Sequence, residues 1–221
     1  MSGDPVSGDP VSGDPGSGTG ITAIVLAGGE SSRFGGDKLA ADLGGTPVLH
    51  HALRAVATVA DDLVLVLAPG APIPPVPDSL ADRVTVARDR EALGGPLAGV
   101  AAGLDVVLSR DHPPRIVIVA GGDMPGMVPG VLRLLADRLG ADGDLAAVAL
   151  DAEPPAPLPM ALRPAAVSDA LSACLTGGRR SLRSLLEAAG AAVLPAGDWL
   201  ALDPSAATLR DIDTPGDLRS G

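Results

Sequence analysis

Short, continuous runs of apolar residues recur along the first two thirds of this chain, separated by segments rich in glycine, proline and charge. The clearest are ITAIVLA at residues 21–27, LVLVLA at 63–68 and RIVIVA at 115–120. Runs of this length without polar alternation are typical of strands buried on both faces, as in a parallel sheet. Two shorter runs, at residues 83–87 and 144–150, predict further strands.

Segments with helix-start signals lie between these runs. Thr46 is a good N-cap with Pro47 at the first helical position, and Pro96 opens a second helical segment. Helices are predicted over residues 47–60, 96–108 and 128–139. Strands that alternate with helices at this spacing favour right-handed βαβ units with helices on both faces of a mostly parallel sheet. The predicted fold class is therefore α/β, a Rossmann-like three-layer domain.

The pattern loosens at the two ends of the chain. Beyond residue 150 it predicts helices near 165–175 and 181–189, short strands near 192–194 and 199–202, and a last short helix from Thr214. Residues 1–19 instead repeat the unit SGDPV and cannot bury apolar surface, so we expect a disordered tail. We expect residues 20–221 to form one domain.

Composition narrows the function classes. The 27 acidic and 16 basic side chains give a formal net charge of −11, and aromatic residues make up only 1% of the 221 residues. Such a chain is a poor nucleic-acid binder, because phosphate contacts need a basic face and single strands need stacking platforms. One cysteine and three histidines argue against a disulfide framework or a Cys/His metal cluster.

The sequence predicts neither a membrane span nor a secretory signal. No apolar run reaches the ~18 residues of a membrane span, and the first residues lack the basic and apolar regions of a secretory signal. We therefore expect a cytoplasmic protein that does not bind membranes.

The loop after the first predicted strand carries the strongest chemical signal. It reads LAGGESSRFGGDK from Leu26 to Lys38. Its four glycines allow the backbone to present N–H groups to an anion, and Arg33 and Lys38 supply two positive charges suited to a triphosphate. The loop is not a Walker motif, since Lys38 precedes leucine rather than serine or threonine. A glycine-rich turn with solvated charges is the simpler alternative.

Two further loops follow predicted strands, where α/β sheets place their ligands. Asp123 in Gly-Gly-Asp-Met-Pro is suited to hold Mg²⁺ together with phosphate oxygens, although an aspartate can also merely form the turn. The segment from Asp89 to Gly99 contains Gly95 and Pro96, which open a helix whose N-terminus is expected to be free to meet a ligand.

Together these segments resemble the molybdenum cofactor guanylyltransferase family of nucleotidyltransferases over residues 21–219. The motifs are LAGG-x-SSR-x₂-GDK, D-x₅-GPLAG and GGDMP, with DIDTPGDL at 211–218 similar to the family's closing segment. The first motif is shared with cytidylyl and sugar-phosphate nucleotidyltransferases. The GPLAG and DMP motifs narrow the resemblance to the molybdopterin branch. Two departures are Ala68-Pro69-Gly70, where the family often has asparagine, and Asp211 and Asp213, where some members have asparagine.

The resemblance implies transfer of GMP from GTP to molybdopterin, with Mg²⁺ as cofactor and pyrophosphate as the second product. By this likeness Asp89 helps to hold the nucleoside, Lys38 reaches the phosphates, Arg33 and Lys38 stabilise charge, and Asp123 binds the metal. The residues expected along the nucleotide are Leu26, Ala27, Gly28, Gly29, Gly95 and Pro96. Transient contact with molybdenum cofactor delivery proteins or apo-molybdoenzymes is also implied.

Several alternatives remain open at this point. The protein could be a cytidylyltransferase, another small-molecule nucleotidyltransferase, or a catalytically silent nucleotide-binding protein. Arg163 and the segment 177–181 are candidates for gripping the pterin phosphate or for plain surface arginines. His50, His51, Cys174 and Trp199 are expected to pack in the core or lie on the surface and to take no part in the chemistry.

Overall fold

The computed structural model describes residues 19–28, 37–89 and 94–219. Among them a seven-stranded sheet has the order β5-β4-β1-β6-β8-β7-β9. Its strands are β1 (Ile21–Leu26), β4 (Asp62–Leu67), β5 (Val84–Arg88), β6 (Ile116–Gly121), β7 (Ala147–Leu150), β8 (Ala156–Leu162) and β9 (Ala192–Leu194). All neighbouring strands pair in parallel except β8, which runs antiparallel to both β6 and β7.

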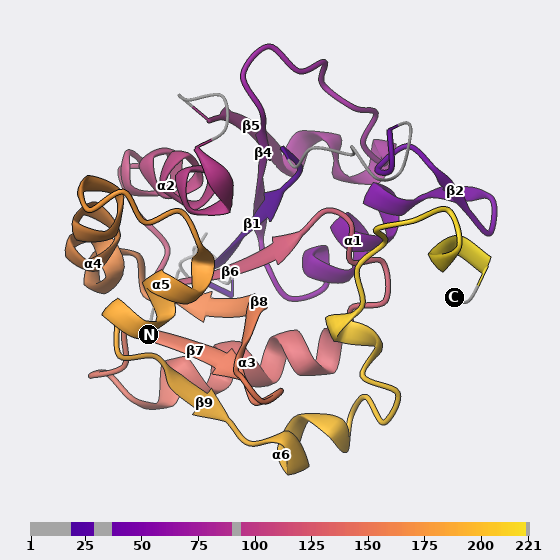
Figure 1. Ribbon diagram of the computed structural model, residues 1–221. Helices are drawn as coiled ribbons and strands as arrows, with labels where there is room; N and C mark the ends of the chain where they lie inside the picture. Colours follow the sequence, from indigo (N-terminus) through magenta and orange to yellow (C-terminus); the bar gives the residue numbers. More distant parts are fainter. Residues whose placement is uncertain (1–18, 29–36, 90–93, 220–221) are drawn as a thin grey trace, which may run out of the picture.

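Helices cover both faces of this sheet, which confirms the predicted three-layer α/β architecture (Figure 1). The helices are α1 (Val48–Ala57), α2 (Gly95–Leu108), α3 (Pro129–Ala141), α4 (Pro164–Thr176), α5 (Leu182–Ala188) and α6 (Ala196–Leu200). One apolar core lies between the sheet and α1 and α3, and another lies between the sheet and α2, α4 and α5. The strands are apolar throughout because both of their faces are buried.

Three local predictions were wrong. Thr46 does not cap a helix; Thr46–Pro47 forms strand β3, which pairs with β2 (Asp42–Leu43) in a small hairpin before α1. Residues 199–202 are not a strand, because Trp199 is buried on helix α6. The strand predicted at 144–150 begins only at Ala147.

The sequence reading missed strand β8 because it contains prolines, which normally exclude a central strand. Its pairing with β6 is confined to Met160–Leu162, and its pairing with β7 to these residues and Ala156. Pro157 and Pro159 therefore lie where no ladder partner is needed.

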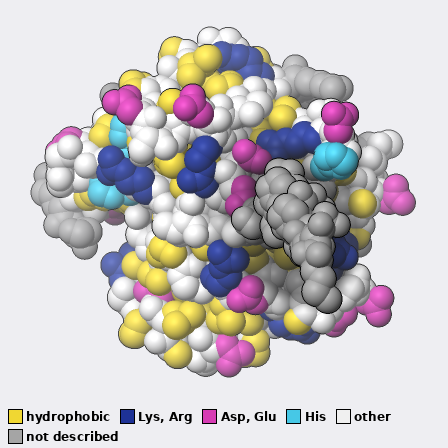
Figure 2. Space-filling view, turned by 180° about the vertical axis from the view of Figure 1, so that it is seen from behind, with side chains coloured by type: hydrophobic (Ala, Val, Ile, Leu, Met, Phe, Trp, Pro, Cys, Tyr) yellow, Lys and Arg dark blue, Asp and Glu magenta, His cyan; other side chains and the backbone are white. Residues whose placement is uncertain are grey.

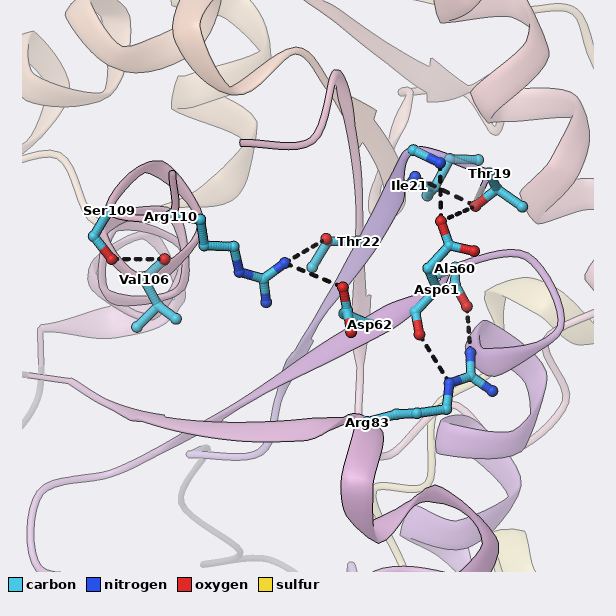
Figure 3. Close-up of polar contacts among 11 residues, drawn as sticks. Thr19, Ile21, Thr22, Ala60, Asp61, Asp62, Arg83, Val106, Ser109 and Arg110 are labelled. Atoms are coloured by element: carbon cyan, nitrogen blue, oxygen red, sulfur yellow. Dashed lines mark hydrogen bonds and ion pairs between the residues drawn. The ribbon is translucent and has the colours of Figure 1, made fainter. Parts of the chain in front are cut away.

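The amino ends of β1 and β4 are tied by polar contacts (Figure 3). The Asp61 carboxylate accepts hydrogen bonds from the Thr19 hydroxyl at 3.0 Å and the Gly20 N–H at 2.9 Å. Arg83 donates to the carbonyl oxygens of Asp61, Ala57 and Ala60, and Arg110 donates to the Thr22 hydroxyl at 3.0 Å. At this edge of the sheet Asp61 and Arg83 therefore hold backbone groups in place.

Charged side chains of opposite sign lie among one another on the face seen in Figure 2. This mixing lowers the self-repulsion expected for a net charge of −11. Within the part of the chain that the structure describes, no helix has both the length and the hydropathy that a bilayer-spanning helix requires.

The C-terminal segment (yellow in Figure 1) returns across the molecule to the loop after β6. Asp203, only 3% exposed, accepts hydrogen bonds from the N–H groups of Ala207 and Thr208 and from the Ser205 hydroxyl. The Thr208 hydroxyl in turn accepts a hydrogen bond from the Val128 N–H at 3.1 Å. Asp203 thus organises the turn that joins the end of the chain to the start of α3.

We predict that Asp203→Asn lowers the free energy of unfolding at pH 7 by about 1.5–3 kcal/mol, the range for hydrogen bonds to a charged group. Burial alone would raise the pKa of Asp203, but the hydrogen bonds outweigh it and lower the pKa. A lowered pKa stabilises the fold above the ordinary Asp value of about 3.9, and this stabilisation is lost as the pH falls further. Urea unfolding at pH 7 and near pH 3 measures both effects.

The exposed Asp144 provides the control for this prediction, since Asp144→Asn removes the same charge from the surface. Equal stabilities for Asp203→Asn and Asp144→Asn would show that the buried carboxylate does not organise the turn.

Candidate functional site

The three chemistry-bearing loops follow β1, β5 and β6 and converge at one edge of the sheet. Strands β5, β4, β1 and β6 lie side by side in this order and are all parallel, so their carboxyl ends share that edge. Beyond the strands, the Ala27 N–H donates to the Val66 carbonyl at 2.8 Å, and the Gly122 N–H donates to the Leu26 carbonyl at 2.9 Å. The loop after β1 and the loop after β6 therefore leave the sheet side by side.

A cavity of about 440 Å³ opens at this edge, a size typical of small-molecule sites. Eight residues expected from the sequence line it: Leu26, Ala27, Gly28, Lys38, Asp89, Gly95, Pro96 and Asp123. Gly29 and Arg33, also expected there, lie outside the described residues. Its other lining residues include Ala68 and Pro69 from the loop after β4, and Leu158 from β8.

Gly28 and Gly121 are required by close approaches in this cavity. A Cβ on Gly28 would lie 2.9 Å from the backbone nitrogen of Ala68. A Cβ on Gly121 would lie 2.5 Å from Oδ1 of Asp123. Glycine at these positions allows the two loops to pack together and the Asp123 carboxylate to fold back over the end of its own strand.

An ion-pair cluster forms one wall of the cavity. Lys38 Nζ lies 2.5 Å from Asp123 Oδ2 and 3.4 Å from Asp213 Oδ1. Carboxylate oxygens of Asp123, Asp211 and Asp213 all lie within 4.8 Å of one another. Hard oxygen donors grouped in this way are suited to a divalent cation such as Mg²⁺.

The pKa values of Lys38 and Asp211 are both raised in this cluster. Burial alone lowers the pKa of Lys38, but the hydrogen bond and charge of Asp123, with a smaller contribution from Asp213, raise it overall. Partial loss of solvent, followed by the negative charge of Asp213, raises the pKa of Asp211. Lys38 is therefore firmly cationic, whereas Asp211 holds a proton more readily than an ordinary aspartate.

Asp211 and Asp213 belong to the closing segment, and the sequence offered them only as alternatives to Asp123 for holding the metal. Ile212 between them is buried, and its N–H donates to the Asp123 carbonyl at 2.9 Å. Asp217 accepts hydrogen bonds from the N–H groups of Asp213 and Thr214 and holds the turn. An apolar residue between two aspartates is a sequence signal for two side chains that share one exposed face. Only the fold shows that this face lies beside the Asp123 loop.

The N-terminus of α2 is less free than expected. Pro96 has no N–H group, and the Leu97 N–H donates to the Arg180 carbonyl at 3.3 Å. The segment 177–181 thus covers part of the helix end and lies beside Gly95, whose added Cβ would lie 3.0 Å from Arg180 Cβ. A ligand at this end would meet the loop backbone and the Asp89 carboxylate as well as the helix.

Arg163 is neither a pterin-phosphate ligand nor a plain surface arginine, whereas Cys174, Trp199, His50 and His51 keep packing or surface roles. The Arg163 guanidinium donates to the carbonyls of Leu139, Leu145 and Asp142, so Arg163 holds the end of α3 and is not a ligand group. The buried Cys174 and Trp199 belong to the two cores. The imidazoles of His50 and His51 lie within hydrogen-bond distance of the Pro75 and Leu43 carbonyls, respectively.

A mostly parallel sheet covered on both faces, with a glycine-lined cavity and an acidic cluster at its carboxyl edge, is the architecture of an α/β nucleotidyltransferase. The family model described as the MobA-like NTP transferase domain matches residues 23–193. The chain belongs to this family, and is an enzyme of the nucleotidyltransferase class.

Curated relatives support this assignment. A probable molybdenum cofactor guanylyltransferase of Mycobacterium avium is 27% identical over 212 residues, which is 90% of this chain and 94% of the relative. A molybdenum cofactor guanylyltransferase of a Bradyrhizobium species is 33% identical over 133 residues, 59% of this chain and 61% of the relative.

Solved structures share the fold. Molybdopterin-guanine dinucleotide biosynthesis protein A from Archaeoglobus fulgidus superposes with a TM-score of 0.69 at 23% identity, covering 90% of this chain and 95% of the other. A 4-diphosphocytidyl-2C-methyl-D-erythritol synthase from Anaerococcus prevotii gives a TM-score of 0.59 at 13% identity, covering 90% and 93%. At these identities the likeness shows the fold alone.

We predict that Gly121→Ala displaces the Asp123 carboxylate, because the new Cβ would overlap Oδ1. The Lys38–Asp123 pair should open beyond 4 Å in a crystal structure of the variant, with a loss of about 1–3 kcal/mol in stability. Gly143→Ala is the matched control, since nothing lies within 4 Å of its added Cβ. An unchanged Lys38–Asp123 distance would mean that Gly121 does not set the position of Asp123.

Proposed function

We propose that this protein transfers GMP from GTP to molybdopterin, which carries molybdenum, giving molybdopterin guanine dinucleotide and pyrophosphate. The observation that carries the proposal is that the loops after β1, β5 and β6 line one cavity, on whose wall Lys38 and Asp123 are in contact. The names of the relatives from Mycobacterium avium and Bradyrhizobium support the choice of substrates.

On the nucleotide side, Leu26, Ala27 and Gly28 would lie along GTP, with Gly29 continuing the same loop. Gly95 and Pro96 would face it across the cavity. Asp89 lies near the start of α2, with Oδ2 3.3 Å from the position of an added Cβ on Gly94. Guanine presents adjacent N–H donors on its Watson–Crick edge, which a carboxylate can accept together. This chemistry favours guanine over cytosine at Asp89.

On the phosphate side, Asp123 would hold Mg²⁺, with Asp213 and Asp211 close enough to share it. When bound, Mg²⁺ neutralises phosphate oxygens and so lowers the barrier between two anionic reactants. Lys38, with Arg33 in the same loop, would spread the charge that develops on the triphosphate. The three carboxylates fit this ion because Mg²⁺ prefers oxygen ligands.

The reaction needs no covalent intermediate on the protein. The terminal phosphate of the acceptor would attack the α-phosphorus of GTP in line, forming one P–O bond as the bond to pyrophosphate breaks. The attacking group is already an anion, so the chain's task is to position both phosphates and offset their repulsion. Leu158 also lines the cavity. The 177–181 loop, which meets the start of α2 through the Arg180 carbonyl, remains the candidate for the acceptor's anionic groups.

Other assignments belong to the same proposal. Residues 20–221 would form the catalytic domain and residues 1–19 a tail outside it. The enzyme would act in the cytoplasm, and its product would pass to delivery proteins or to molybdoenzymes that await the cofactor.

A nucleotide panel tests the base. GTP with Mg²⁺ should raise the melting temperature more than CTP, UTP or ATP does, because binding only the native state stabilises it. Incubation with GTP and molybdenum-loaded molybdopterin should yield the dinucleotide and pyrophosphate. Stabilisation by CTP alone would instead assign a cytidylyltransferase, and binding without pyrophosphate release would assign a silent nucleotide-binding protein.

We predict that Lys38→Ala lowers kcat/KM for GTP by ~10–100-fold, the loss expected for one charged hydrogen bond to a phosphate. Steady-state kinetics measure the effect. Arg115→Ala is the control, because Arg115 is an exposed cation just before β6, at the opposite edge of the sheet. Wild-type kinetics for Lys38→Ala would mean that Lys38 does not reach the nucleotide.

We predict that Asp123→Asn lowers turnover far more than GTP binding. The variant preserves the shape of the side chain but removes negative charge from the metal ligands, and the metal acts most strongly on charge in the transition state. GTP affinity with and without Mg²⁺ and dinucleotide formation are the measurements, with the exposed Asp137→Asn as the control. Normal turnover with unchanged Mg²⁺ dependence would transfer the metal role to Asp211 or Asp213.

A further inference from the structure

Lys38 is the only lysine in the chain, since the other 15 of the 16 basic Lys and Arg residues are arginines. This single ammonium group lies in the acidic cluster of the cavity, paired with Asp123 and Asp213. A lysine differs from an arginine in being a compact charge on a flexible stem with rotatable donors, without a fixed fork that holds a carboxylate in two places. Such a group can leave a carboxylate and pair with another anion at little cost in geometry.

The position of the ammonium group conflicts with metal binding. At 2.5 Å from Asp123 Oδ2, Lys38 Nζ engages one of the two oxygens of the carboxylate that the proposed function assigns to Mg²⁺. Its second contact, with Asp213 at 3.4 Å, engages another carboxylate of the same group. A divalent ion held by these oxygens must therefore displace the lysine or share them with a like charge at short range, which is unfavourable.

The backbone around Lys38 is fixed, so the displacement requires only the side chain to move. The Leu39 carbonyl accepts a hydrogen bond from the Leu49 N–H at 3.0 Å, which ties the segment to α1. Asp37 Oδ1 accepts one from the Leu39 N–H, also at 3.0 Å. On the other side, the carbonyl of Asp123 is tied to Ile212. The carboxylates and the lysine's Cα are thus held in place while the four-carbon stem can rotate.

We propose that Lys38 is an exchangeable counter-ion of the metal-binding carboxylates. In the free protein its ammonium group occupies the cluster and keeps divalent cations weakly bound. An incoming nucleoside triphosphate, whose phosphates carry more negative charge than any one carboxylate, draws the ammonium group away and opens the cluster to the metal. Nucleotide and metal consequently bind cooperatively. The identity of the nucleotide rests on the proposed function, but the competition between Lys38 and the metal does not.

Metal binding to the free protein tests the competition directly. Mn²⁺ serves as the probe, its free concentration followed by electron paramagnetic resonance in titrations of the full chain without nucleotide. Lys38→Met removes the ammonium group and keeps a long stem, and it should bind Mn²⁺ at least about tenfold more tightly than wild type, the scale of one charged hydrogen bond. Equal or weaker binding by Lys38→Met would overturn the proposal.

A control separates this effect from the general loss of a positive charge. Arg138 forms an exposed pair with Asp142 near the end of α3, with Nη1 3.7 Å from Oδ2. Arg138→Met should change the Mn²⁺ affinity less than twofold, because exposed charges are screened over distance. A gain as large as that of Lys38→Met would show a nonspecific charge effect and would also overturn the proposal.

The single lysine allows its movement to be observed in the wild-type protein. In protein labelled with ¹⁵N-lysine, Lys38 gives the only side-chain ammonium signal. GTP in the absence of metal should shift this signal as the ammonium group leaves the carboxylates, and GTP should raise the Mn²⁺ affinity by a larger factor in wild type than in Lys38→Met. An unmoved signal with GTP bound, or equal factors in the two proteins, would refute the exchange.

Failure of the proposed function is distinguishable from failure of this inference. A protein that binds no GTP by calorimetry would refute the function and the nucleotide-driven step. The Mn²⁺ comparison without nucleotide would still decide whether Lys38 competes with the metal.

Discussion

One ammonium group pairs with two of the three carboxylates that are grouped at the carboxyl edge of this sheet. Lys38 contacts Asp123 and Asp213 directly, and Asp211 lies within reach of both. Without a cation these carboxylates would repel one another. Partial loss of solvent, followed by the negative charge of Asp213, already raises the pKa of Asp211. The cavity wall therefore depends on a charge balance that a metal ion or a substrate anion can alter.

The fold maintains this arrangement with groups that take no part in it. Ile212 is buried and ties the C-terminal segment to the carbonyl of Asp123. Asp203 organises the preceding turn, and Asp217 the following one. Because the closing segment is anchored on both sides of Asp211 and Asp213, two exposed carboxylates are kept beside a third instead of moving apart. The last twenty residues thus complete a site begun by the first strand.

The acidic character of the whole chain is compatible with anionic substrates because the local field at the cavity decides binding. Glycine backbone at Gly28 and the ammonium group of Lys38 face the space where phosphates would lie. Arg163, a candidate ligand of the acceptor's phosphate from the sequence, is instead bound to carbonyls at the end of α3. Lys38 would therefore serve both the acidic cluster and the proposed triphosphate.

The sequence by itself determined the three-layer α/β fold, the convergence of three loops and eight cavity residues, because buried parallel strands and glycine loops have strong local signatures. It did not reveal β8, whose prolines occupy unpaired positions, or the helix at Trp199. Tertiary structure alone decided that Arg163 holds α3, that Arg180 covers the start of α2, and that Asp211 and Asp213 join Asp123 around Lys38. These are contacts between residues 18 to 175 positions apart, which local pattern cannot specify.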